Sequence, residues 1–121
     1  MKKLILGFSV AATMASAQSL EPLKTKLASI KILTDEKSLT LYVFDKDKED
    51  VSNCYDDCAA TWPPLLTTAE TLKDPLSVVK RNDGTKQIAF KKRPLYKYDG
   101  DAVTSDINGD GLGKIWHVVH P

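Results

Sequence analysis

Short runs of apolar residues recur along this chain, and a polar turn separates each run from the next. Residues 29–34 and 39–44 are rich in β-branched and aromatic side chains and lie on either side of a polar stretch, which predicts a β-hairpin. Residues 77–81 and 86–90 repeat this pattern around an Asp-Gly turn, which is a strong hairpin signal. The pattern therefore indicates a protein made mostly of short antiparallel strands.

Three further elements follow from the same reading. Residues 94–98 and 114–119 have the alternation and composition of strands. Residues 58–62 are compatible with one helical turn, and Pro63 and Pro64 must end it because proline cannot continue a helix. Little helix is expected elsewhere.

The run 39–44 carries apolar groups on both of its faces. Successive side chains of a strand point to opposite sides, so two sets of three residues separate. One set is Leu39, Leu41 and Val43, and the other is Thr40, Tyr42 and Phe44. A strand that is apolar on both faces is expected to be central in the fold.

The chain repeats itself without a gap when it is shifted by 54 residues. A period near this length is typical of a duplicated structural unit. The sequence therefore predicts a mainly β protein with little helix: a single small antiparallel β domain over 29–121, built from two repeats at about 29–66 and 77–121. Besides the aromatic pair Phe44/Tyr98, the identical pairs are Leu41/Leu95, Tyr42/Tyr96, Asp45/Asp99, Asp47/Asp101, Asp56/Asp110 and Trp62/Trp116.

Residues 1–17 have the features of a signal peptide. Two lysines precede the mostly apolar residues 4–14, and Ala15-Ser16-Ala17 is a small-x-small cleavage site. Cleavage before Gln18 leaves residues 18–28 as an N-terminal leader segment and places the protein in the periplasm or outside the cell. The residue directly after the cleavage site is Gln18 and not a cysteine that could carry a lipid, so no membrane anchor is expected after processing.

The charges of the processed chain are nearly balanced. Without the two lysines of the signal peptide, 15 basic residues stand against 16 acidic ones, and the signs are interspersed. No basic face is therefore expected that would attract nucleic acid or an anionic membrane surface.

The chain has two cysteines, Cys54 and Cys58. An exported protein meets an oxidising compartment, and three intervening residues on a helical turn bring the two Cα atoms into disulfide range. A structural disulfide is the main interpretation. The alternative is a pair of thiolates that binds Cu(I) or takes part in thiol redox chemistry.

A glycine-rich loop in the second repeat resembles the opening half of a calcium-binding EF-hand. Asp106, Asn108 and Asp110 occupy the alternate ligand positions ahead of a glycine. Lys114 and His117 stand where the second half needs further ligands, so a full Ca²⁺ cage is not expected. A tight polar loop is the main interpretation, and a metal site at these three residues is the alternative.

Asp47 and Asp101 recur at equivalent places while most of their neighbours differ. We expect each carboxylate to hold main-chain N–H groups of the loop that follows it. The sequence has no Gly-x-Ser-x-Gly, His-Glu-x-x-His or phosphate-loop motif, so no enzymatic activity is expected.

The motif Tyr-x-aromatic-x-x-Asp occurs twice and resembles the motif of a family of small exported bacterial proteins, often lipoproteins, known as the secreted repeat of unknown function. The motif residues are Tyr42, Phe44 and Asp47 with Trp62, and Tyr96, Tyr98 and Asp101 with Trp116. Paired cysteines before Trp-Pro-Pro, an Arg-x-Asp-Gly turn and a Pro-Leu-Tyr step also agree with the family pattern. The resemblance implies an exported fold and no established activity.

These observations favour a non-enzymatic exported module that binds an unknown periplasmic ligand or protein. No cofactor is expected. The alternative is a periplasmic copper or thiol-redox protein that uses Cys54 and Cys58, and calcium is the other metal to consider.

Overall fold

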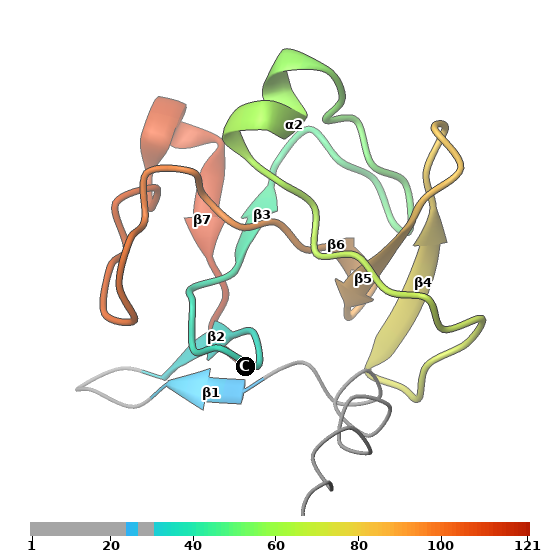
Figure 1. The fold of residues 1–121 in the computed structure, drawn as a ribbon, viewed down its shortest axis with the longest axis horizontal. Helices are drawn as coiled ribbons and strands as arrows, with labels where there is room; N and C mark the ends of the chain where they lie inside the picture. The colour runs from blue at the N-terminus through green and yellow to red at the C-terminus, as the bar shows by residue number, and fades with distance from the viewer. Residues whose placement is uncertain (1–23, 27–30) are drawn as a thin grey trace, which may run out of the picture.

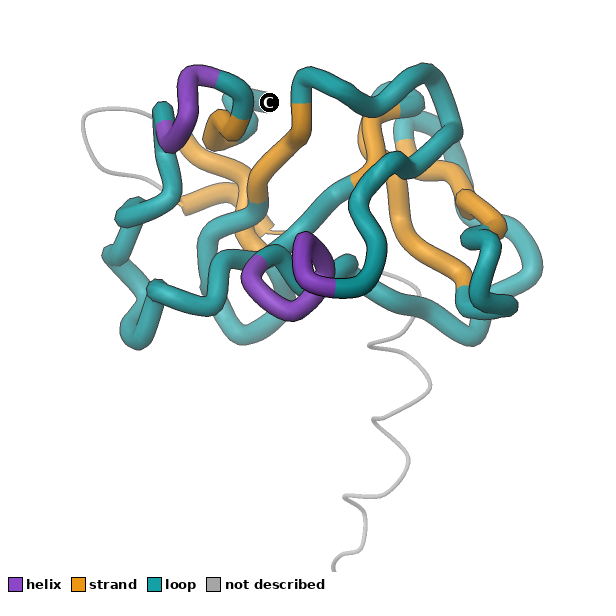
Figure 2. The backbone as a smooth tube through the Cα atoms, turned by 90° about the horizontal axis from the view of Figure 1, so that it is seen from above, coloured by secondary structure: helices purple, strands orange, loops and turns teal. Residues whose placement is uncertain are grey.

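The computed structural model describes residues 24–26 and 31–121, and its strands form three small antiparallel sheets (Figure 1). Loops and turns connect these short elements over most of the trace (Figure 2). The predicted mainly β fold with little helix is confirmed. The sheets pair β1 (Lys24–Lys26) with β2 (Ile32–Thr34), β3 (Tyr42–Phe44) with β7 (Trp116–Val118), and β5 (Lys86–Phe90) with both β4 (Leu76–Lys80) and β6 (Arg93–Pro94).

The helical segments are short. Among the described residues they are α2 (Asp57–Thr61) and the 3-10 turn η2 (Leu112–Lys114). Among the residues that the structure describes, no helix is long and apolar enough to cross a membrane.

A local two-fold relation between the repeats is visible in the main chain. Tyr42 and Tyr96, which are 54 residues apart, exchange both of their main-chain hydrogen bonds, at 2.8 and 2.9 Å. Equivalent residues face each other in this antiparallel way when a two-fold axis passes between them. The same relation pairs Tyr42 with Val118 and Tyr96 with Pro64. The two repeats have equivalent main-chain pairings, and each supplies a pairing partner to the other.

The predicted hairpin of residues 77–81 and 86–90 is present as β4 and β5, in register from Leu76↔Phe90 to Lys80↔Lys86. Its turn is closed by the Gly84 N–H, which donates to the Arg81 carbonyl at 3.1 Å. Gly84 has a φ of +89°. Glycine adopts this conformation without the steric cost that other residues incur.

The predicted hairpin of residues 29–34 and 39–44 forms only in part, since its pairing is confined to residues near the turn, such as Thr34 with Thr40. Asp35 stabilises that turn by accepting hydrogen bonds from the N–H groups of Lys37 and Leu39, at 2.8 and 2.9 Å. The chain then leaves its neighbour because β3 pairs with β7 on one edge and Tyr96 takes the other. Residues 29 and 30 lie outside the described part of the chain.

The later predictions differ from the structure at their boundaries. The helical turn is confirmed as α2, which ends before Pro63. The predicted strand 114–119 begins only at Trp116, because Lys114 lies in η2 with a φ of +63°, which an extended strand does not allow. The predicted strand 94–98 is reduced to β6 and the bridges that Tyr96 makes.

Strand β3 is central, as predicted, because its two faces enter two different hydrophobic clusters. Leu41 and Val43 lie in an aliphatic cluster, which is completed by Leu33, Leu65, Ile88 and Leu95. Tyr42 and Phe44 lie in an aromatic cluster, which is completed by Cys54, Trp62, Tyr96 and Trp116. The alternation of a single strand thus separates the core into two layers.

The N-terminal predictions fall mostly outside the described residues, which include neither the signal peptide 1–17 nor most of the leader segment 18–28. Within that segment, Lys24–Lys26 forms β1 and pairs with β2. The register of this pairing, Lys26 with Ile32, is that of Lys80 with Lys86 in the second repeat, 54 residues on. Strand β1 therefore belongs to the first repeat.

Candidate functional site

Four of the six aromatic residues of the family motif form one continuous stack, and Tyr42 and Tyr96 meet it edge-on. Its order is Phe44, Trp116, Trp62 and Tyr98, with ring centroids 4.1, 3.8 and 4.4 Å apart. The two repeats contribute the rings in the order first, second, first, second. Trp62 and Trp116 are each only 5% exposed. The stack is therefore a core that joins the repeats, and it is not an open platform for a ligand.

Each motif tyrosine donates a hydrogen bond to the motif aspartate of the other repeat. The Tyr42 hydroxyl donates to Asp101 Oδ2 at 2.6 Å, and the Tyr96 hydroxyl donates to Asp47 Oδ2 at 2.7 Å. Burial, together with the neighbouring carboxylate, raises the pKa of both tyrosines well above the usual range. Burial also raises the pKa of Asp47, although hydrogen bonds from the Asn53 N–H and the Tyr96 hydroxyl act in the opposite direction.

The other oxygen of each aspartate holds a loop, as the sequence predicts. Asp47 Oδ1 accepts from the Asn53 N–H at 2.7 Å, and Asp101 Oδ1 accepts from the Asn108 N–H at 3.0 Å. The asparagines are six and seven residues after their aspartates. The second loop is therefore one residue longer, which places Gly109 where the first repeat has Cys54.

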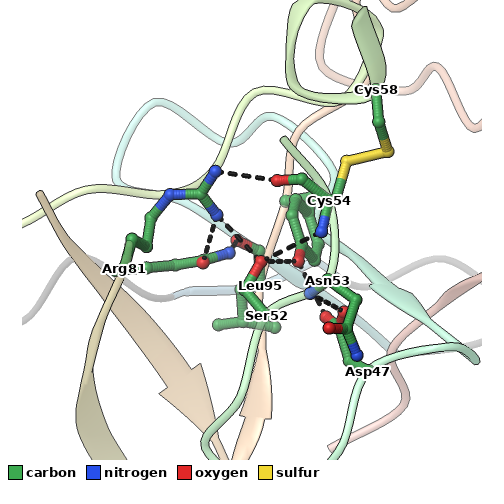
Figure 3. Close-up of a disulfide and its surroundings, with 9 residues drawn as sticks. Asp47, Ser52, Asn53, Cys54, Cys58, Arg81 and Leu95 are labelled. Carbon is green, nitrogen blue, oxygen red and sulfur yellow. Dashed lines mark hydrogen bonds between the residues drawn. A yellow bond between two sulfur atoms is a disulfide. The ribbon is translucent and has the colours of Figure 1, made fainter. Parts of the chain in front are cut away.

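The predicted disulfide is present between Cys54 and Cys58, with an S–S distance of 2.00 Å (Figure 3). Both sulfurs are used in this bond, and Cys54 is fully buried. The carbonyl of Cys54 accepts a hydrogen bond from Arg81 NH2 at 2.8 Å. The disulfide loop is thus fixed to the second repeat at its buried end.

Arg81 is a buried cation, whereas its sequence pattern indicates only the first residue of an Arg-x-Asp-Gly turn. Its NH1 donates to Ser52 Oγ and to Gln87 Oε1, both at 2.9 Å, and its guanidinium lies 4.3 Å from the centre of the Tyr55 ring. No local pattern singles out Ser52, because its bond to Arg81 joins residues that are 29 apart in the sequence, and the contacts of Gln87 depend on the pairing of β5 with its neighbours.

These contacts connect the buried Arg81 to the half-buried Asp47 through neutral hydroxyls (Figure 3). Arg81 donates to Ser52, the hydroxyls of Ser52 and Tyr96 are 2.6 Å apart, and Tyr96 donates to Asp47. The second repeat closes the equivalent position differently, since the Gly109 N–H donates to the Tyr42 hydroxyl at 3.2 Å. The two repeats therefore share a scaffold and differ in the second hydrogen bond of the tyrosine hydroxyl, which Ser52 makes to Tyr96 and the Gly109 N–H makes to Tyr42.

The residues considered as calcium ligands each hold main chain. Asp106 Oδ2 accepts from the Ala102 and Val103 N–H groups, and Asp110 Oδ1 accepts from the Val118 N–H at 3.0 Å. The side chain of Asn108 donates to the Gly100 carbonyl. In residues 24–26 and 31–121, no three His, Cys, Asp or Glu side chains gather as metal ligands.

An open groove with a volume of about 870 Å³ lies between the repeats, and we call it the inter-repeat groove. Its walls come from the turn after β2, the segment 65–68 and the β4–β5 hairpin. Because these segments are far apart in the sequence, the pattern within any one of them does not reveal the groove. Its lining residues are Asp35, Glu36, Lys37, Leu39, Leu65, Leu66, Thr67, Thr68, Gly84, Thr85, Lys86, Ile88 and Lys97.

The groove combines apolar side chains with three lysines, and Asp35 and Glu36 add carboxylates on one side. Leu65 and Ile88 belong to the aliphatic cluster, whereas Leu66 is 51% exposed. Lys86 Nζ is paired with Glu70 at 2.7 Å. For Lys37 and Lys97, no ion pair with another described residue is found.

Comparison with known proteins agrees with the two-repeat architecture. A family model described as the secreted repeat of unknown function matches residues 31–66 and 77–120. No curated protein and no solved structure matches the chain. The matched segments cover both repeats and the whole of the aromatic stack, so the chain belongs to the family of secreted repeats of unknown function.

Proposed function

We propose that this protein is an exported, non-enzymatic binding module whose ligand occupies the inter-repeat groove. The groove is the observation that carries this proposal, since it is open, about 870 Å³ in volume and lined by both repeats. Five of the six motif aromatics are buried and not available to a ligand, and the sixth, Tyr98, is half-buried at the end of the stack. A groove of this size is in the range that binds small molecules or short peptide segments.

The chemistry of the groove favours a ligand that joins an apolar group to a carboxylate. The half-buried Leu39 and the exposed Leu66 give an apolar surface, and Lys37 and Lys97 give two positive charges. Side chains of this kind recognise an apolar residue that is next to an acidic one.

The main chain of segment 65–68 favours an extended peptide. The Thr67 N–H and the Leu65 carbonyl bond to Lys86 and Ile88, so the N–H and C=O of Leu66 point away from β5. No hydrogen bond joins those two groups to another described residue. An added peptide strand uses free groups of this type.

A peptide-display selection on the immobilised protein tests the proposal. We expect enrichment of peptides with an apolar residue beside Asp or Glu, and at least about tenfold weaker binding to a Lys37→Glu/Lys97→Glu variant. Lys48→Glu is the matched control, because Lys48 is exposed and lies outside the groove. Equal binding to both variants would show that the groove is not the site.

The proposal includes export to the periplasm, removal of the signal peptide before Gln18, and function without a resident cofactor. Protein purified natively from the periplasm is expected to begin at Gln18 and to contain no titratable thiol and no stoichiometric metal. Bound calcium would contradict the cofactor-free proposal. Two free thiols with bound copper would instead favour the alternative, a copper or thiol-redox protein that uses Cys54 and Cys58.

A further inference from the structure

The contacts that build the core run between the two repeats. Trp62 stacks on Trp116 at 3.8 Å with an interplanar angle of 2°. Strand β3 of the first repeat pairs with β7 of the second, and each motif tyrosine donates to the aspartate of the other repeat. Each repeat alone would expose the aromatic faces that the other covers.

The connector between the repeats, residues 67–75, takes little part in this interface. Most of its residues are exposed. Hydrogen bonds join the Thr67 N–H, the Thr68 carbonyl and the Glu70 carboxylate to Lys86 of the second repeat, and the Thr67 hydroxyl oxygen accepts from the nearby Ala69 N–H. Leu72 is the connector residue that packs, partly buried, against the aliphatic cluster. The disulfide lies within the first repeat, so the repeats can separate without breaking a covalent bond.

We propose that the inter-repeat surface is also an interaction surface between two copies of this chain, through exchange of repeats. The first repeat of one copy then pairs with the second repeat of the other, and the reverse pairing completes a symmetric dimer. Every contact across the interface is kept, because both copies offer the same residues. The path of the connector is what changes.

The connector sets the balance between the two forms. A short flexible linker holds its ends at an effective concentration on the order of 1 mM, so pairing within one chain dominates in dilute solution. Exchange grows when chains fold at a concentration close to that value. This inference does not depend on the groove binding a ligand.

Two full-length variants with matched lesions test the exchange. Leu41 and Leu95 are equivalent residues, and both are fully buried. Leu41→Asp places a charge in the core of the first repeat and Leu95→Asp does so in the second, so each variant alone is expected to be unfolded. In the mixture, the intact first repeat of the Leu95→Asp chain pairs with the intact second repeat of the Leu41→Asp chain. This gives one native unit per two chains, so the near-ultraviolet circular dichroism per chain is expected to be about half that of the wild type. The product is expected to elute as a dimer.

A mixture that gains no signal over the separate variants would overturn the proposal. A second measurement uses the wild-type chain and covers the case in which one variant folds alone. Unlabelled and ¹⁵N-labelled chains are unfolded, mixed and refolded together at about 1 mM, where exchange competes with pairing within one chain. Mixed dimers in native mass spectrometry support exchange, and a product that is entirely monomeric contradicts it.

Discussion

At the scale of single residues, the least replaceable groups are those that meet at the local two-fold axis. Tyr42 and Tyr96 are fully buried, and the hydroxyl of each donates a hydrogen bond to a carboxylate of the other repeat. A tyrosinate in either place would lose that hydrogen bond and would lie beside a negative charge. The folded protein therefore strongly favours the neutral tyrosines.

This preference predicts a loss of stability in alkali. Above about pH 10 the unfolded chain loses the two tyrosine protons and the folded chain keeps them, so the free energy of unfolding falls by about 1.4 kcal/mol per pH unit for each tyrosine. Urea unfolding between pH 8 and 11 measures the slope. The Tyr42→Phe variant is expected to be less stable at pH 8 and to have a shallower slope, and an unchanged slope would contradict this account.

Gly109 is required by a close approach. A Cβ atom at this position would lie 2.6 Å from the buried Trp62 ring and 3.1 Å from Tyr42. Gly109→Ala is therefore expected to cost about 1–3 kcal/mol in thermal or urea unfolding, as overpacking does elsewhere. Gly100→Ala is the comparison: its Cβ would lie 2.5 Å from the Tyr98 ring, which is half-buried at the end of the stack and is expected to yield more easily than the buried Trp62. Equal costs for the two variants would contradict the assignment.

At the scale of elements, the two repeats close the same loop by different means. Both loops begin with an aspartate that holds an asparagine N–H. The first then continues into α2, which the Cys54–Cys58 disulfide fixes. The second continues into η2, where Gly111 and Gly113 both have positive φ. The disulfide thus holds the helical turn of the first repeat, and glycines with positive φ allow the tight turn of the second.

Reduction of the disulfide is expected to destabilise the protein without unfolding it. The bond closes a loop of only five residues, so loop-closure entropy gives it about 2 kcal/mol. Arg81 continues to hold the Cys54 carbonyl in the reduced protein. Urea unfolding with and without a phosphine reductant measures the difference, and complete loss of near-ultraviolet circular dichroism on reduction would contradict the expectation.

At the scale of the whole molecule, the aromatic stack joins the repeats into one cooperative unit. Its central pair, Trp62 and Trp116, lies in direct contact. The paired tryptophans are also equivalent residues of the two repeats. Damage to one repeat is therefore expected to weaken the other.

A double-mutant cycle on Trp62→Leu and Trp116→Leu measures this coupling. Either substitution alone removes the whole of the central stacking contact, so the second is expected to cost less than the first by about 0.5–1.5 kcal/mol. Phe44→Leu with Trp62→Leu is the comparison, because these two rings are not stacked on each other. Additivity within about 0.3 kcal/mol for the tryptophan pair would argue against a shared stack.

Much of the fold follows from local patterns. The Asp-Gly turn predicts β4 and β5, and the proline pair fixes the end of α2. The hairpin at 29–44 was predicted at full length and forms only near its turn, because the partners that take the edges of β3 come from the other repeat. Competition of this kind is not visible in the strand itself.

The candidate site was less accessible to prediction. The loop-holding role of Asp47 and Asp101 follows from their recurrence. The tyrosine partners of these aspartates lie 49 and 59 residues away along the chain. Arg81, Ser52 and the inter-repeat groove became recognisable only when distant segments were placed side by side.

The sequence by itself determined the duplication, the short antiparallel strands and the family, and it favoured the closed cysteine pair that the structure contains, since each depends on residue type at short spacing. The tertiary structure alone decided that the repeats face each other across a two-fold axis and exchange tyrosine hydrogen bonds, that Arg81 is buried, and that a groove remains open between the halves. The physical reason is that burial and hydrogen bonding are satisfied by whichever group the fold brings near. A local pattern shows which side chains need partners, and the packing of the two repeats selects those partners.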